Sequence, residues 1–162
     1  MLTTPDLTCT AFHPDGHLLA VGTVSGQLQV FDIKSGTLGG SFDLDGPATV
    51  VCFSENGTWV ATASQDSSAV SIWNLRKTGA EALLYRLETG SHVTSISWDY
   101  TAQFLAVGSL EGITVKHYTK ATKEWSEPFK TELPSRAIGW GDSAQSILSL
   151  DNEGHVLLIS SV

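Results

Sequence analysis

The stretch TVVCFSENGTWVATASQDSSAVSIWNL, from Thr49 to Leu75, alternates short apolar runs with turn-forming residues. One apolar run ends at Phe53, a Glu-Asn-Gly turn follows, a second run carries small side chains, and a third ends at Trp73. Short runs that are rich in Val, Thr and aromatic residues, and bounded by Asn, Gly and Ser, are typical of β-strands joined by hairpins. This stretch therefore predicts three consecutive antiparallel strands.

Three other stretches repeat this pattern. They are LTCTAFHPDGHLLAVGTVSGQLQVFDI (Leu7–Ile33), VTSISWDYTAQFLAVGSLEGITVKHYT (Val93–Thr119) and RAIGWGDSAQSILSLDNEGHVLLIS (Arg136–Ser160). The aromatic residue that ends the first strand recurs in steps of 41, 45 and 42 residues, at Phe12, Phe53, Trp98 and Trp140. A marker late in the third strand recurs in steps of 42, 44 and 42 residues, at Phe31, Trp73, His117 and Ile159. Two independent markers with one period of roughly 40–45 residues are typical of WD repeats, which fold as blades of a β-propeller.

Less apolar segments between the copies are candidate outer strands, at Thr37–Leu44, Ala82–Leu87 and Glu127–Leu133. We therefore expect an all-β fold, a WD-repeat β-propeller of four-stranded antiparallel blades. The predicted domain is a partial propeller over 1–162, with blades at about 5–44, 47–88, 91–133 and 134–162. The sequence ends directly after the third strand of the last copy, so this blade is expected to lack its outer strand.

The hydrogen-bonded network of a complete WD repeat is only partly present. The Trp-Asp pair of a complete repeat is Phe31-Asp32 in the first copy and Trp73-Asn74 in the second, and it is lost in the last two. Ser64, Asp66 and Trp73 are expected to form what remains of the network. The blades should therefore depend mainly on apolar packing.

The charge of the chain excludes one class of partner. The net charge is −8, whereas nucleic-acid binding needs a basic patch. The stretch from Lys116 to Lys130 holds acidic residues as well, and we interpret it as a solvated outer face. No apolar run approaches the roughly 18 residues of a membrane-spanning helix. We expect neither nucleic acid nor a membrane as a direct partner.

Catalytic and metal-binding motifs are missing from the sequence. It contains no GxxxxGK[ST], HExxH, GxSxG or GxGxxG motif, and its five histidines are scattered. Cys9 and Cys52 are predicted to be buried free thiols, with a disulfide as the alternative. The residues expected to line the central channel include no carboxylate for glycosidase chemistry: Thr8, Thr10, Val50, Thr94, Ser95 and Ala137. We expect no enzyme activity, metal or cofactor in this chain.

Loops at one end of the blades form the candidate protein-binding face. Propellers commonly bind partners with the loops that lead into the first strand and those that join the second strand to the third. Here these loops contain Ser25, Pro47, Asp66, His92, Glu111, Arg136 and Glu153. Asp66 is interpreted first as structural, whereas Glu111 and Glu153 either contact a basic peptide or only solubilise their turns. Trp125, in a polar stretch, either covers the outer edge of its blade or is an exposed anchor for a partner.

The second copy also resembles one particular family. Its runs FSENG, VATA, QDSS and WNLRK, between Phe53 and Lys77, are similar to FSENG, LATA, DDSS and WDLRK in the C-terminal propeller of the pre-mRNA-processing factor 19 family. The third copy, with FLAVG from Phe104 and Glu111 at its turn, looks like the next blade. The resemblance covers most of the chain and is weakest after Ser126. Departures are an extra residue at Ala69 and the loss of Trp-Asp in the last two copies.

This resemblance implies a nuclear protein-binding scaffold of a spliceosome-associated ubiquitin ligase. The propeller of that family recruits substrates and splicing factors for pre-mRNA splicing, while an N-terminal U-box carries the ligase activity and a coiled coil makes the homo-oligomer. Neither of these segments is found in the 162 residues. The family also implies a ring of about seven blades, so this chain needs the missing half of the propeller. The alternative is a WD-repeat substrate receptor or peptide reader of another nuclear or cytoplasmic complex, which the period and turns fit equally well.

Overall fold

The chain folds into antiparallel β-sheets made of strands consecutive in sequence. The computed structural model describes residues 6–142 and 145–160, and within these ranges three sheets have four strands and a fourth has three. The first blade consists of β1 (Leu7–Phe12), β2 (Leu18–Thr23), β3 (Gln27–Asp32) and β4 (Thr37–Asp43). The second consists of β5 (Ala48–Phe53), β6 (Trp59–Ser64), β7 (Ala69–Asn74) and β8 (Leu83–Glu88), with a short 3₁₀ turn, η1 (Gly79–Ala82), before β8. The third consists of β9 (Val93–Trp98), β10 (Phe104–Ser109), β11 (Ile113–Thr119) and β12 (Glu124–Thr131). The fourth consists of β13 (Ala137–Trp140), β14 (Ser146–Leu150) and β15 (Val156–Ser160).

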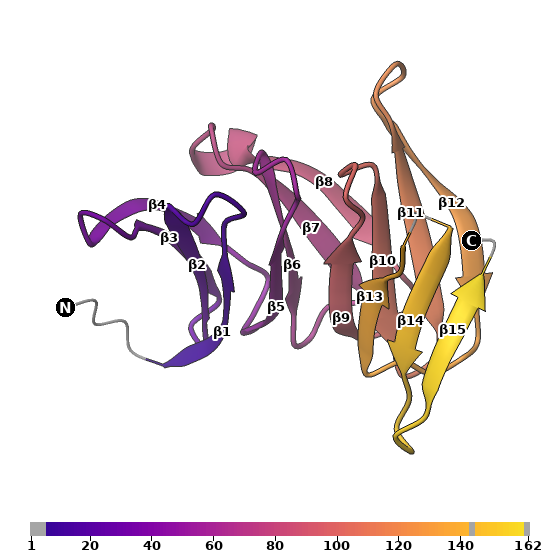
Figure 1. Cartoon of the computed structure of the whole chain (residues 1–162). Coiled ribbons are helices and arrows are strands. Elements are labelled where there is room, and N and C mark those ends of the chain that lie inside the picture. Colours follow the sequence, from indigo (N-terminus) through magenta and orange to yellow (C-terminus); the bar gives the residue numbers. More distant parts are fainter. Residues whose placement is uncertain (1–5, 143–144, 161–162) are drawn as a thin grey trace.

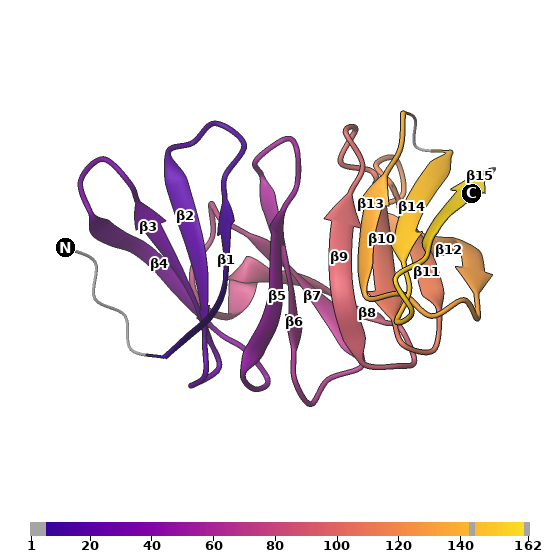
Figure 2. The ribbon, with the colours of Figure 1, turned by 60° about the horizontal axis from the view of Figure 1, so that its bottom comes forward.

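The four blades lie side by side as an arc (Figure 1). The first strands of successive blades are neighbours, since β1 contacts β5, β5 contacts β9, and β9 contacts β13. Figure 2 shows these four strands next to one another along one side of the arc. Four-stranded meanders whose first strands share the inner side form a β-propeller, and the all-β propeller predicted from the repeats is confirmed.

The outer strands lie close to their predicted positions, with one larger difference. Strand β12 begins at Glu124 rather than Glu127, because residues 124–126 pair with the end of β11. The register of this pair shifts between Val115 and His117. A β-bulge there extends the pairing beyond what the polar sequence suggested.

The turn between β9 and β10 is stabilised differently from the corresponding turns of the first two blades, which contain glycine. Gly16 and Gly57 have positive φ angles, as their hairpin-turn sequences predicted. In the third blade the fully buried Asp99 accepts hydrogen bonds from the backbone amides of Thr101, Gln103 and Phe104, at 2.7–2.9 Å. This carboxylate holds the turn although Ala102, with φ 56°, occupies the left-handed position. The corresponding turn predicted at 142–144 lies mostly outside the described residues.

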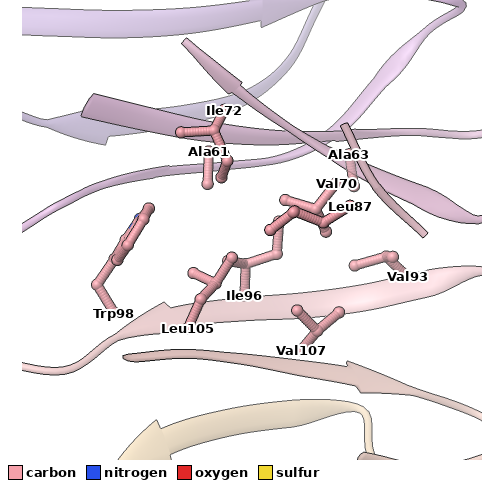
Figure 3. Close-up of a cluster of buried hydrophobic side chains, with 10 residues drawn as sticks. All are labelled: Ala61, Ala63, Val70, Ile72, Leu87, Val93, Ile96, Trp98, Leu105 and Val107. Atoms are coloured by element: carbon pink, nitrogen blue, oxygen red, sulfur yellow. The ribbon is translucent and has the colours of Figure 1, made fainter. Parts of the chain in front are cut away.

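Apolar side chains hold each blade against the next. Because side chains alternate along a strand, Ala61 and Ala63 of β6 face the third blade while Val60 faces the first. The cluster between the second and third blades is shown in Figure 3 and consists of Ala61, Ala63, Val70, Ile72, Leu87, Val93, Ile96, Trp98, Leu105 and Val107. Each fully buried Val, Leu or Ile contributes about 1.5–3 kcal/mol to folding. Inner blades are therefore stabilised on both faces.

In the second, third and fourth blades, the aromatic residue that ends the first strand packs on the blade before it. Phe53 contacts the His13 ring with centroids 5.1 Å apart, and Trp98 contacts Trp59 at 5.9 Å. Trp140 lies 6.1 Å from Phe104, and its indole Nε1 donates a 2.9 Å hydrogen bond to the Ser97 carbonyl. The marker that revealed the repeat is thus the residue that joins neighbouring blades.

The hydrogen bond of Trp73 differs from the expected one. Its indole Nε1 donates to the Thr62 hydroxyl at 2.9 Å, rather than to Ser64. The Asp66 side chain is exposed and takes no part in this contact. The predicted network of Ser64, Asp66 and Trp73 is therefore wrong, and a buried Trp–Thr bond within one blade replaces it.

Candidate protein-binding face

The strand pairing brings all seven predicted face residues to one end of the blades. In each antiparallel blade the start of the first strand lies beside the end of the second, as in the pairs Ala48↔Ser64 and Val93↔Ser109. Ser25, Asp66, Glu111 and Glu153 lie in the connections between second and third strands. Pro47, His92 and Arg136 directly precede β5, β9 and β13. Six of the seven residues are exposed and Pro47 is half-buried. Their binding role stays a prediction.

A pocket of about 220 Å³ lies beside Glu111 on this face. Its walls are the β8–β9 connection, the β10–β11 hairpin and the end of β12. We call it the Glu111 pocket, and its lining residues are Thr89, Gly90, Ser91, Ser109, Glu111, Gly112, Thr114, Lys130, Thr131 and Glu132. Of the lining residues, only Glu111 was predicted from the sequence to lie on the binding face. Lys130 and Glu132 were missed because the repeat markers do not fall on the end of an outer strand.

The buried hydroxyl of Ser109 organises the hairpin that carries Glu111. Its Oγ accepts hydrogen bonds from the backbone amides of Glu111 and Gly112, and it donates to the Gly112 carbonyl at 2.9 Å. Ser91 Oγ donates to Ser109 Oγ at 2.7 Å, which links the β8–β9 connection to the hairpin. A Cβ atom at Gly112 would lie 2.0 Å from the Thr131 carbonyl oxygen, so only glycine lets the hairpin approach β12 this closely. The wall that positions Glu111 is thus held by several contacts.

The corresponding hairpin of the fourth blade has different surroundings. Asp151 Oδ1 accepts hydrogen bonds from the amides of Glu153 and His155, and its Oδ2 lies 2.9 Å from His155 Nδ1. The hydrogen bond from the His155 amide is the main reason why the pKa of Asp151 is lowered. Glu153 lies 3.7 Å from the same imidazole. Glu153 thus lies beside a histidine that can pair with it when protonated, whereas Glu111 has no ion-pair partner among the described residues.

The Asp66 hairpin is joined to its surroundings by Arg86. This guanidinium forms an ion pair with Asp45 in the connection between the first two blades, and its Nη2 donates to Ser67 Oγ at 3.3 Å. Glu88 lies 3.5 Å from Arg86 Nε. Asp66 itself makes no hydrogen bond or ion pair among the described residues, so its carboxylate is open to solvent.

Comparison with known proteins shows which sequences this chain resembles. Residues 3–56 match the family described as the anaphase-promoting complex subunit 4 WD40 domain. The chain is 30% identical over 153 residues to pre-mRNA-processing factor 19 of Schizosaccharomyces pombe, which covers 93% of this chain and 31% of that protein. It is 39% identical over 122 residues to the Bos taurus protein of the same name, covering 75% of this chain and 23% of the relative. The chain thus spans about a third or less of the relatives it matches.

Solved structures agree on the fold. The crystal structure of a mitotic checkpoint complex contains a chain that superposes with a TM-score of 0.79 at 13% identity, covering 96% of this chain and 51% of that one. The β-propeller domain of Cps50 (Swd1) from Myceliophteria thermophila gives a TM-score of 0.78 at 16% identity, with 96% and 53% covered. The chain is a WD-repeat β-propeller domain. It resembles pre-mRNA-processing factor 19 over most of its length, as the second copy predicted.

Trp125 of the WD-repeat domain is packed rather than free. Its ring lies 5.4 Å from Tyr118 and 5.9 Å from Trp98, in an aromatic group that also includes Trp59 and Tyr85. Desolvation, followed by the contact with Tyr118, raises the pKa of Tyr85 to about 12. Trp125 therefore joins the outer edges of two blades, and the alternative of an exposed anchor is not supported.

The remaining chemical groups suggest no further site within residues 6–142 and 145–160. Cys9 and Cys52 are free and partly buried, and desolvation raises the pKa of both thiols. No group of three or more His, Cys, Asp or Glu side chains in these ranges could hold a metal ion. The same ranges contain no helix long and apolar enough to cross a membrane.

Proposed function

We propose that this WD-repeat domain is a protein-binding scaffold module for pre-mRNA splicing. The observation that carries the proposal is its similarity to pre-mRNA-processing factor 19 over 93% of the chain. The exposed loops at one end of the blades and the Glu111 pocket supply a surface on which proteins can dock. In this proposal the domain acts in the nucleus and recruits splicing factors and ubiquitination substrates. It does no chemistry itself and serves a ubiquitin ligase whose U-box and coiled coil lie outside these residues.

The domain is proposed to work inside a larger ring. Residues 1–162 then form one partial propeller whose blades extend over about 5–44, 47–88, 91–133 and 134–162. The support is the pair of uncovered end faces: Phe12 is 69% exposed in the first blade, and Leu148 and Leu158 are exposed in the last. This chain also covers only about half of the two solved chains described above. Further blades, about seven in all, would bury both faces.

A pull-down from nuclear extract tests the scaffold role. The domain in its completed ring is used as bait, unchanged or with Glu111→Lys and Glu153→Lys, and the captured proteins are identified by mass spectrometry. We expect splicing factors to be enriched on the unchanged bait and reduced on the variant, because the substitutions reverse two charges on the face. Enrichment of no splicing factor would overturn the function, and unchanged capture by the variant would overturn the face.

A second candidate function is a substrate receptor or peptide reader of another nuclear or cytoplasmic complex. The match of residues 3–56 to the anaphase-promoting complex subunit 4 WD40 domain favours it. The same pull-down separates the two candidates, because this alternative expects ligase or chromatin subunits in place of splicing factors.

A further inference from the structure

The Glu111 pocket combines a polar floor with an acidic rim. Strand alternation decides what faces into it: Ile113 and Val115 of β11 pack toward the fourth blade, so Thr114 between them faces the second. Thr114 is directly paired with Val107 on one side and Lys130 on the other. Val107 belongs to the cluster between the second and third blades. The row of these three side chains therefore lies on the same side of the blade as the β8–β9 connection.

The Thr114 hydroxyl is a polar group without a partner in this pocket. The residue is only 5% exposed, yet its side chain makes no hydrogen bond among the described residues. By contrast, Thr89 Oγ1 has the Ser68 and Ser91 carbonyl oxygens within reach of its single O–H, and Ser109 Oγ is fully engaged in the hairpin. The hydroxyl oxygen is not among the buried side-chain atoms that lack a partner, so it is open to the pocket rather than enclosed by protein. Thr114 is thus available to a ligand that reaches the floor of the pocket.

The charges at the rim favour a cation. Glu111 and Glu132 are exposed, and neither carboxylate lies within ion-pair distance of Lys130 or of another basic side chain in the described residues. Two carboxylates face one ammonium, in a chain whose net charge is −8. Such a field attracts positive groups and repels negative ones. An acidic ligand would be attracted by Lys130 but repelled by both Glu111 and Glu132.

The size of the pocket restricts the ligand further. At about 220 Å³ it is smaller than the roughly 300–1,000 Å³ of pockets that enclose drug-sized molecules. One long side chain suits this volume better than a cofactor does. Its polar floor and acidic rim match an extended side chain that ends in several N–H donors, which only lysine and arginine provide.

From these observations we propose that the Glu111 pocket receives a lysine or arginine side chain from an extended segment of a partner protein. The charged end donates an N–H to the Thr114 hydroxyl at the floor, in the field of Glu111 and Glu132 at the rim. The inference rests on the proposed protein-binding function and names the chemistry of the partner. It also gives Glu111 a role that Glu153, beside His155, does not share.

Saturation-transfer difference NMR tests the proposal, because it observes the small ligand and works with a protein of any size. The probes are N-acetyl-arginine amide and N-acetyl-citrulline amide, which have nearly the same shape but differ in charge. We expect saturation transfer to the arginine probe and little to the citrulline probe. Glu111→Gln and Glu132→Gln should each weaken arginine binding by up to about five-fold, the upper value for an exposed ion pair. Thr114→Val should weaken it without changing the salt dependence.

Glu55→Gln is the matched control, since it removes the same charge from an exposed turn, between β5 and β6, at the opposite end of the blades. Circular dichroism melts check that every variant keeps its fold. Equal transfer to citrulline, or arginine binding that survives the double change at Glu111 and Glu132, would overturn the pocket assignment. Because no cellular partner is needed, an intact arginine response with a failed pull-down overturns only the splicing function. The reverse pair of results overturns only the pocket.

Discussion

The inner junctions of this propeller differ sharply from its two end faces. Phe53 and Trp98 are each 5% exposed because a preceding blade covers them, whereas Phe12, at the same place in the first blade, is 69% exposed. At the other end, Leu148 pairs with Leu158 and Leu150 with Val156, and all four side chains are exposed. One repeated pattern thus produces buried contacts wherever a neighbour exists and an apolar surface where none does. Contacts between blades therefore add to the stability that each blade has by itself.

The largest expected difference lies between Trp98→Ala and Phe12→Ala. Trp98 packs among Trp59, Leu105 and Ile96, so its truncation leaves a cavity and should cost about 3–5 kcal/mol of unfolding free energy. Phe12→Ala in this chain alone should change stability by no more than about 0.5 kcal/mol. Urea denaturation measures both. In a completed ring Phe12→Ala should become as costly as Trp98→Ala, and a small effect there would contradict the idea that a blade covers Phe12.

Replacing Trp73 by phenylalanine makes the second blade resemble the first blade, which has Phe31 at the corresponding position. Trp73 donates a buried hydrogen bond to Thr62, while its counterpart Phe31 has no such donor. Trp73→Phe should cost about 1 kcal/mol for the lost bond, together with the packing of the smaller ring. Thr62→Val removes the acceptor and leaves the buried indole N–H of Trp73 without a hydrogen-bond partner. The double variant should therefore be less destabilised than the sum of the two single variants, and strict additivity would show that the bond contributes nothing.

The outcome for Trp73 illustrates which features the sequence could predict. Val60, Thr62 and Ser64 all lie on one face of β6, so the alternation alone could not decide which hydroxyl meets the indole. That choice depends on register, and Trp73 pairs with Val60, which brings Thr62 closer than Ser64. Features that recur once per blade, such as the strands and the aromatic markers, were predictable because a period of 41 to 45 residues repeats them.

The Glu111 pocket was not predictable for a related reason. Glu111 lies at an aligned hairpin position and was found, but Lys130 lies in an outer strand whose register shifts at a bulge, and Glu132 directly follows that strand. Thr114 looked like an ordinary strand residue until the packing of Ile113 and Val115 showed which way it faces. Sites that combine several elements depend on exact register, which a period does not determine.

A smaller effect is expected at the exposed leucines of the fourth blade. Leu148→Lys together with Leu158→Glu should change the unfolding free energy by no more than about 0.5 kcal/mol, because these side chains face away from the third blade. The same pair should reduce self-association, since it breaks an apolar patch. Size-exclusion chromatography measures the association, and Ser160→Lys, at the end of β15, is a control for added charge. Equal self-association of the variant and the unchanged chain would show that the chains do not associate through this face.

Lowering the pH should destabilise the first and fourth blades before the two inner blades. The pKa values of Asp15 and Asp32 in the first blade and Asp151 in the fourth are lowered, chiefly by backbone amides that donate to their carboxylates. A carboxyl whose pKa is lower in the folded chain stabilises the fold above its ordinary value of 3.8, and this contribution is lost as pH falls through the folded value. Hydrogen exchange at about pH 5 and about pH 3 should therefore show amides of β3 and β15 losing protection before those of β6 and β10.

Asp32→Asn should reduce the pH dependence in the first blade, because the amide keeps an acceptor for Ser35 but cannot titrate. Asp66→Asn, at a carboxylate that accepts no hydrogen bond within the described residues, is the matched control and should leave the dependence unchanged. Simultaneous loss in all four blades would mean that the end faces are coupled to the inner junctions more tightly than their exposure indicates.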